Sequence, residues 1–257
     1  MYKVIKVTFW VLVVLITSCQ SDSFSPVKEV EQKIELIDFY RSHFMNDKVD
    51  TYVNIQNYQA NFIADLWGEN NYASVVCGGK DNGLCEANKL EVDEITFVFD
   101  QGSTIVQSDE YKQIFGKRVN LSYAGQEVDG RNDSEDNIYV PDILEVSIGE
   151  QPVLVNGYPI TWNADQDNTS GVYIVVEYSP LENMHLRAQY SDSEFAYINV
   201  PDNGVYDFSK SDFSNVPDGS TVVLRIIRGA FTISDFEEEA VSFSALTHVG
   251  GFAKIPS

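Results

Sequence analysis

Acidic and amide side chains alternate along one short segment, Asn163-Ala-Asp165-Gln-Asp167-Asn168. Hard oxygen atoms at alternating positions are the ligands that Ca²⁺ takes, because a turning loop can direct them at one centre. The same composition is typical of a solvated turn, since Asp and Asn side chains there bond to the backbone. Asn163, Asp165 and Asp167 are therefore candidate calcium ligands, with a solvated turn as the favoured interpretation and no cofactor required.

The start of this segment resembles the EF-hand calcium loop, but the likeness does not continue. Asn168 stands at the sixth position, where that family has glycine, and Ile174 stands at the twelfth in place of glutamate. Residues 129–137 form a second acidic segment for which calcium and a solvated loop are again the two interpretations.

The chain has only three histidines, and they do not have the spacing of a catalytic or metal site. His43, His185 and His248 lie far apart, and none has a partner at the spacing of a zinc-binding helix. Nucleophile elbows, phosphate-binding loops and dinucleotide fingerprints are absent from the sequence. Two carboxylates could hydrolyse a glycoside, but among 39 Asp and Glu residues any pair is uninformative. We therefore expect no enzyme and keep a carboxylate-dependent glycoside hydrolase as the minor alternative.

Aromatic rings offer a binding chemistry, with 14 Tyr, 15 Phe and 3 Trp in the chain. Exposed rings can stack on the apolar faces of sugars within a polar setting. Trp67 and Tyr72 enclose the polar residues 68–71 and are candidate ligand contacts, although core packing is the favoured role. Trp162 alternates with Ile160 and is expected in the core.

The net charge is −22, from 39 acidic and 17 basic residues. A nucleic-acid binder needs cations for the phosphates, so this function class is excluded. Electrostatic docking on anionic lipid is excluded for the same reason.

Two cysteines, Cys77 and Cys85, enclose a loop rich in Gly and Asn. Their separation does not match the spacing of a zinc or redox pair, and no histidine lies nearby. We predict a structural disulfide, which suits an oxidising compartment and would add roughly 2–3 kcal/mol of stability.

The N-terminus carries a targeting signal. Lys3 and Lys6 accompany an apolar run, residues 7–16, that is shorter than the about 20 residues that span a bilayer. Residues 16–19, Ile-Thr-Ser-Cys, resemble the lipobox of bacterial lipoproteins. The resemblance implies that residues 1–18 are a signal peptide and that Cys19 is lipidated. An ordinary secretory signal with a chance cysteine, or an uncleaved anchor, is the alternative.

A polar tether, residues 19–26, would follow the lipid. By the retention rule of lipoproteins, Gln20 favours the outer membrane, on either its periplasmic or its outer side. Beyond the tether, the spacing of apolar residues over 27–47 favours a helix, and alternation then predicts strands, as at 51–55 and 95–99.

The polar stretch 129–137 is the predicted boundary between two domains. Residues 27–138 are expected to form a β-rich N-terminal domain, and residues 139–257 a second one. About seven strands are expected there, near 144–148, 160–162, 172–178, 195–200, 221–227, 230–233 and 241–245. Gly229 is expected to separate two of them. The strand at 172–178 is apolar on both faces, which predicts a central place in a sheet.

The run Ile160-Thr-Trp162-Asn-Ala-Asp165, followed by Ser170-Gly-Val-Tyr-Ile174, resembles immunoglobulin-like modules of Bacteroidota lipoproteins. Strand patterns in both regions predict a mostly β chain. The resemblance, which covers roughly residues 141–257, implies that the C-terminal region is an Ig-like β-sandwich, as the strand number also suggests. We expect a lipid-anchored envelope protein with a non-catalytic binding, adhesion or assembly role. Its partners would be the membrane, through acyl chains, and a glycan or another envelope protein. A glycan-binding accessory lipoprotein of a polysaccharide uptake system is the alternative.

Overall fold

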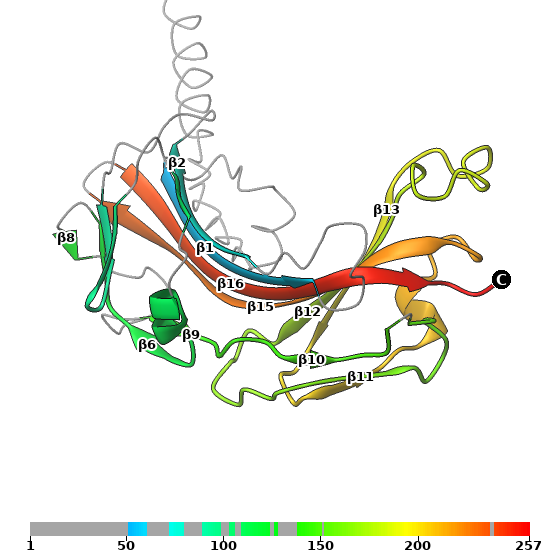
Figure 1. Cartoon of the computed structure of the whole chain (residues 1–257), viewed down its shortest axis with the longest axis horizontal. Coiled ribbons are helices and arrows are strands. Elements are labelled where there is room, and N and C mark those ends of the chain that lie inside the picture. Colours follow the sequence, from blue (N-terminus) through cyan, green and yellow to red (C-terminus); the bar gives the residue numbers. More distant parts are fainter. Residues whose placement is uncertain are drawn as a thin grey trace, which may run out of the picture. The chain divides into compact units, whose positions relative to one another are not determined.

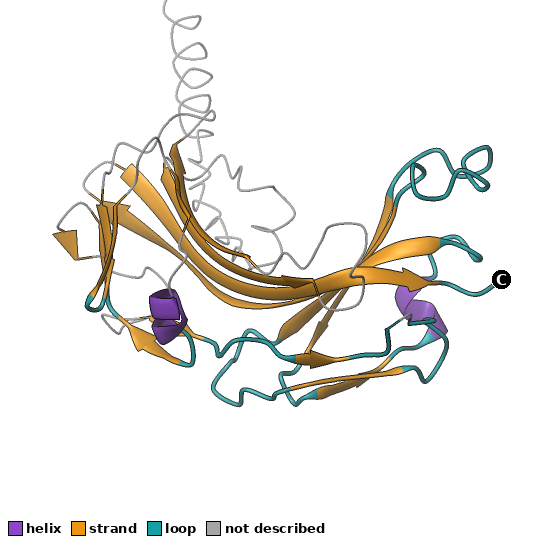
Figure 2. Ribbon diagram, viewed as in Figure 1, coloured by secondary structure: helices purple, strands orange, loops and turns teal. Residues whose placement is uncertain are grey.

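Most of the described chain is β-strand. The computed structural model describes residues 51–60, 72–79, 89–98, 103–105, 109–123, 126–127, 138–150, 152–236 and 239–257. All of them belong to Ile34–Ser257, one of two units into which the chain divides. The helical segments of this described part are short 3-10 helices, η2 (Asp109–Ile114) and η3 (Lys210–Phe213), so the prediction of a mostly β chain is confirmed (Figure 2).

A seven-stranded sheet is the framework of the described residues (Figure 1). Its strands, in spatial order, are β13 (Glu194–Val200), β12 (Val172–Tyr178), β15 (Thr221–Phe236), β16 (Glu239–Lys254), β1 (Thr51–Ala60), β2 (Tyr72–Gly79) and β5 (Ser103–Ile105). Neighbouring strands are antiparallel except β1 and β16, which run parallel from the pair Thr51 and Val241 to the pair Ala60 and Gly250.

Three smaller sheets accompany it. One contains β10 (Val146–Ser147), β11 (Pro159–Trp162) and β14 (Val205–Asp207). Another contains β4 (Ile95–Val98), β3 (Lys89–Val92), β7 (Leu121–Tyr123) and β8 (Gln126–Glu127). The last pairs β6 (Lys117–Val119) with β9 (Ile138–Val140).

The parallel pairing crosses the predicted domain boundary. β15 and β16 form a hairpin in which each strand has 16 residues, and the far side of β16 binds β1. Strands from before and after residues 138 and 139 therefore share one hydrogen-bonded sheet. Alternation within a strand predicts which face is buried, but it does not identify a partner this distant in the sequence.

Buried apolar side chains form separate clusters along the sheet. The first includes Val53, Ile55 and Phe243. The second joins Ile160 of β11 to residues of β12, and it contains Trp162, which is 6% exposed. The core position predicted for Trp162 is therefore confirmed. Because β11 and β12 belong to different sheets, this cluster is a core between two sheets, whereas the Ig-like identity stays a prediction.

The central place predicted for residues 172–178 is confirmed, since β12 lies between β13 and β15. Its alternating side chains enter two clusters. Ile174 belongs to the second cluster, and Tyr173 and Val175 belong to a third one with Ile227 and Leu246. Both faces of the strand are therefore covered.

The predicted strand end at Gly229 is wrong, because β15 continues through it. A Cβ built on Gly229 would lie 2.5 Å from the carbonyl oxygen of Ala245 and 2.6 Å from Cδ2 of Leu246. The glycine therefore marks a close approach of the neighbouring strand and not a turn.

Several predictions concern residues outside the described ranges. These are the signal peptide, Cys19 and its tether, the helix over 27–47 and the acidic loop 129–137. None of the helical segments that the structure describes has the length and apolar composition of a membrane span.

We expect Gly229→Ala to lower the free energy of unfolding by about 1–3 kcal/mol, because the added methyl group would overpack against β16. Gly149→Ala is the matched control, since its Cβ would meet only the movable Tyr158 hydroxyl at 3.1 Å. Urea unfolding measures both variants. Equal stability of the two would contradict the close approach at Gly229.

The change of stability with pH should depend on His248 in β16. Burial, followed by the nearby Arg225 charge, lowers the pKa of His248 from 6.5 to about 4. Between these values the unfolded chain binds a proton that the folded chain does not, so the free energy of unfolding falls as the pH falls. Glutamine does not titrate, so the free energy of unfolding of His248→Gln should fall by about 3 kcal/mol less than that of the wild type between pH 7 and pH 4.

Urea unfolding across that pH range tests the expectation. The exposed His185 supplies the control variant, His185→Gln, whose profile should follow the wild type. A His248→Gln profile parallel to both would show that His248 does not titrate differently on folding.

Candidate functional site

A charged side chain lies buried in the middle of β15. The side chain of Arg228 has no exposed surface, and its Nη2 lies 2.8 Å from Oδ1 of Asp202, whose side chain is 1% exposed. Asp202 belongs to the turn between β13 and β14. A buried guanidinium without a counter-charge is strongly destabilising, so this ion pair fixes the turn to the sheet.

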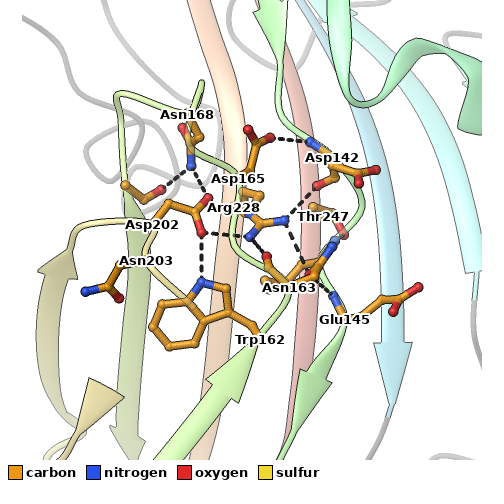
Figure 3. Close-up of polar contacts among 12 residues, drawn as sticks. Asp142, Glu145, Trp162, Asn163, Asp165, Asn168, Asp202, Asn203, Arg228 and Thr247 are labelled. Carbon is orange, nitrogen blue, oxygen red and sulfur yellow. Dashed lines mark hydrogen bonds and ion pairs between the residues drawn. The ribbon is translucent and has the colours of Figure 1, made fainter. Parts of the chain in front are cut away.

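Arg228 also binds two further segments (Figure 3). Its Nη1 donates to the Asp142 carbonyl oxygen at 3.2 Å and lies 3.5 Å from Oδ1 of Asn163. Its Nη2 donates to the Asn163 carbonyl oxygen. The planar guanidinium carries several donors in a fixed plane, so one side chain joins the segment before β10, the end of β11 and the β13–β14 turn.

Two more donors share the Asp202 carboxylate. Nε1 of Trp162 donates to Oδ1 at 2.8 Å, and Nδ2 of Asn168 donates to Oδ2 at 2.9 Å. The indole ring therefore stays in the core with its N–H paired. Asn168 also donates to the Gly171 carbonyl oxygen at 2.8 Å and accepts from the Ser170 N–H at 3.2 Å, which closes its own loop.

Asp165 collects a second set of donors. The Tyr139 hydroxyl lies 2.9 Å from both carboxylate oxygens, and the N–H groups of Asp142 and Asp167 donate at 2.8 Å and 3.1 Å. Burial and the hydrogen bond to Asp165 raise the pKa of Tyr139. The phenol therefore remains a protonated donor at neutral pH.

The candidate calcium ligands make protein hydrogen bonds. Oδ1 of Asn163 accepts from the Glu145 N–H, and its Nδ2 donates to the Ile143 carbonyl oxygen, each at 2.8 Å. A calcium ion would have to displace the donors to Asn163 and Asp165, whereas Asp167 is exposed. Within the described ranges, no three His, Cys, Asp or Glu side chains are grouped to hold a metal ion. Calcium binding stays a hypothesis.

Two loops enclose an open depression of about 690 Å³ beside this network. Its lining comes from residues 164–166 and 168–171, after β11, and from residues 199–203, at the end of β13. Gly171 has a φ of +76°, and a Cβ there would clash with the Val200 carbonyl oxygen. Glycine therefore allows the two loops to meet.

The exposed part of the lining carries no charged side chain. Its polar side chains are amides and hydroxyls, and the apolar Ala164 and Pro201 are exposed beside them. The polar ones are Gln166, Thr169, Ser170, Asn199 and Asn203. The carboxylates of Asp165 and Asp202 are buried, and each of their oxygens accepts a hydrogen bond from the protein. The depression is therefore equipped to bind a ligand by neutral hydrogen bonds.

The other predicted site residues lie elsewhere. Tyr72 is the first residue of β2, which four strands separate from β13 in the sheet, and Trp67 lies outside the described residues. Cys77 is buried in β2. Cys85 lies outside the described residues, so the disulfide stays a prediction.

Sequence patterns did not single out Arg228, Asp202 or Tyr139. One signal was present: Arg228 interrupts an apolar stretch, and a charge inside a buried strand requires a partner. The partner itself is not identifiable from the sequence, because 39 acidic residues are candidates.

No protein-family model, curated protein or solved structure matches the chain.

We expect Asp202→Asn to lower the free energy of unfolding by about 3–5 kcal/mol, because it leaves the Arg228 charge buried without a counter-charge. Asp207→Asn, at an exposed acid of β14, is the control and should change stability by less than about 0.5 kcal/mol. Adding Arg228→Met to Asp202→Asn should recover part of the loss, since no charge is then buried. Urea unfolding measures all three. Similar losses in Asp202→Asn and Asp207→Asn would contradict the role of the ion pair.

Proposed function

We propose that this protein is a lipid-anchored binding protein of the bacterial cell envelope without a catalytic role. Its place is the outer membrane, on the periplasmic or the outer side. One observation carries the binding part: a buried ion pair, Arg228–Asp202, fixes loops around an open depression whose exposed side chains are neutral. The ligand or another envelope protein is recognised there, at the loop end of a β scaffold.

Fixed loops favour recognition over rearrangement. The 2.9 Å bond from Asn168 to Asp202 connects the two loops that line the depression. Asp165, through Tyr139 and the Asp142 N–H, ties the first loop to the segment around β9. Because the loops are already ordered before a ligand binds, little conformational entropy is lost on binding, which favours affinity.

The same hydrogen bonds favour binding over hydrolysis. A general acid or base must exchange a proton with its substrate, and a glycosidase uses two carboxyl groups facing the scissile bond. Asp202 is ion-paired to Arg228, and Asp165 accepts three donor groups of the protein. Neither carboxylate of the depression is presented to a substrate.

The envelope part of the proposal depends on residues 1–19. A basic start, an apolar run and the sequence Ile-Thr-Ser-Cys together resemble a lipoprotein signal. Acyl chains on Cys19 would anchor the protein by about 0.8 kcal/mol per buried CH₂ group. Such an anchor suits a chain of net charge −22, because anionic lipid would repel it.

We expect Cys19→Ala to abolish lipid labelling and to move the protein out of the membrane fraction, because the acylated thiol is lost. Metabolic labelling with a fatty-acid probe and fractionation of the membranes measure the two effects. Ser21→Ala, which keeps the cysteine, is the control and should behave as the wild type. Undiminished labelling of Cys19→Ala would refute the lipid anchor.

A further inference from the structure

One face of β13 leads from two aromatic rings into the depression. Alternation along a strand places Phe195, Tyr197 and Asn199 on the same face, and Asn199 lines the depression. β13 is the edge of the seven-stranded sheet among the strands that the structure describes. The rings and the depression are therefore consecutive parts of one surface.

The two rings form a platform that the core supports. Their centroids are 5.9 Å apart and their planes differ by 13°, so they stack. Tyr197 packs against the third core cluster, which contains Tyr173 and Val175, while Phe195 is 38% exposed. The Asn215 side chain donates to the Phe195 carbonyl oxygen at 2.6 Å and so fixes the backbone below the exposed ring.

We infer that this platform and the depression together bind a neutral oligosaccharide, an inference that rests on the proposed binding function. A sugar ring has an apolar C–H face and hydroxyl groups that both donate and accept hydrogen bonds. An aromatic ring such as that of Phe195 fits the first. Amide and hydroxyl side chains, which also donate and accept, fit the second.

The length of the surface requires more than one sugar unit. Asn199 lies four positions after Phe195, which corresponds to about 13 Å at about 3.3 Å per residue along a strand. A single ring stacked on Phe195 would not reach the depression beyond Asn199. The fitting ligand is therefore a chain of sugars that lies along β13.

Electrostatics makes the neutral sugar the best match. Lysine and arginine are absent from the lining of the depression, and the net charge of −22 repels polyanions. The buried acids at its base, Asp165 and Asp202, already accept protein donors, so they offer little to a cationic ligand. Nearby, Glu177 of β12 is paired with Arg225 at 2.6 Å.

Calorimetric titration of the lipidated protein in detergent with short neutral oligosaccharides of glucose, mannose, galactose and N-acetylglucosamine tests the inference. We expect binding that changes little with salt, because no ion pair forms.

Phe195→Ala and Asn199→Ala should each raise Kd by about tenfold or more, whereas Phe195→Tyr keeps the ring and should preserve binding. Val98→Ala changes an exposed side chain of a different sheet and is the control. Because Phe195→Ala also loses the stacking on Tyr197, the melting temperature of each variant is measured and binding is compared at a temperature at which all of them are folded.

The saccharide inference is overturned if none of these oligosaccharides binds, or if Val98→Ala weakens binding as much as Phe195→Ala does. A peptide library is screened in parallel. If peptides bind, depend on Asn199 and no oligosaccharide binds, the saccharide inference is overturned. The proposed binding function would then still hold. Fatty-acid labelling of Cys19 is measured on the same preparation, so a failure of the lipid anchor is recognised independently of either result.

Discussion

A guanidinium group sealed from water is the constraint on which the arrangement of the candidate site depends. Arg228 lies in the longest hairpin of the described sheet, and its charge must be met by protein groups because no solvent reaches it. Asp202 supplies the counter-charge, and two carbonyl oxygens accept further donors. A buried pair of this kind adds little net stability compared with apolar packing, but it penalises every arrangement in which the partners are apart. We hypothesise that its role here is to select one geometry for the loops.

This requirement sorts the polar groups of the loops into two populations. The two carboxylates of the lining turn inward, where Asp202 meets Arg228 and Asp165 meets Tyr139. The exposed Asp167 of the same loop is not part of the lining, and the exposed polar side chains of the lining are amides and hydroxyls. A strongly acidic protein thus presents a locally neutral surface. The net charge of −22 of the whole chain repels polyanions.

The shared sheet explains how one scaffold supports the rings and the depression together. β12 separates β13 from the β15–β16 hairpin, and it is covered by core clusters on both faces. Tyr197 rests on one of these clusters, so the exposed Phe195 ring is held by packing as well as by the Asn215 hydrogen bond. Gly171 allows the loop after β11 to approach the end of β13. Rigid strands therefore position both parts of the proposed ligand surface.

The sequence alone determined the features that depend on near neighbours. Alternating apolar residues predicted a mostly β chain, the two-sided strand at 172–178 and the core position of Trp162. Tertiary structure alone decided the pairing of β1 with β16, the continuity of β15 through Gly229, and the choice of Asp202 from 39 acids as the partner of Arg228. The depression and its neutral lining were likewise invisible in the order of residues. The physical reason is the distance along the chain over which each interaction acts. Periodicity and turn chemistry involve residues a few positions apart. The strand that pairs in parallel, or the acid that neutralises a buried charge, depends on which groups the folded chain brings together away from water.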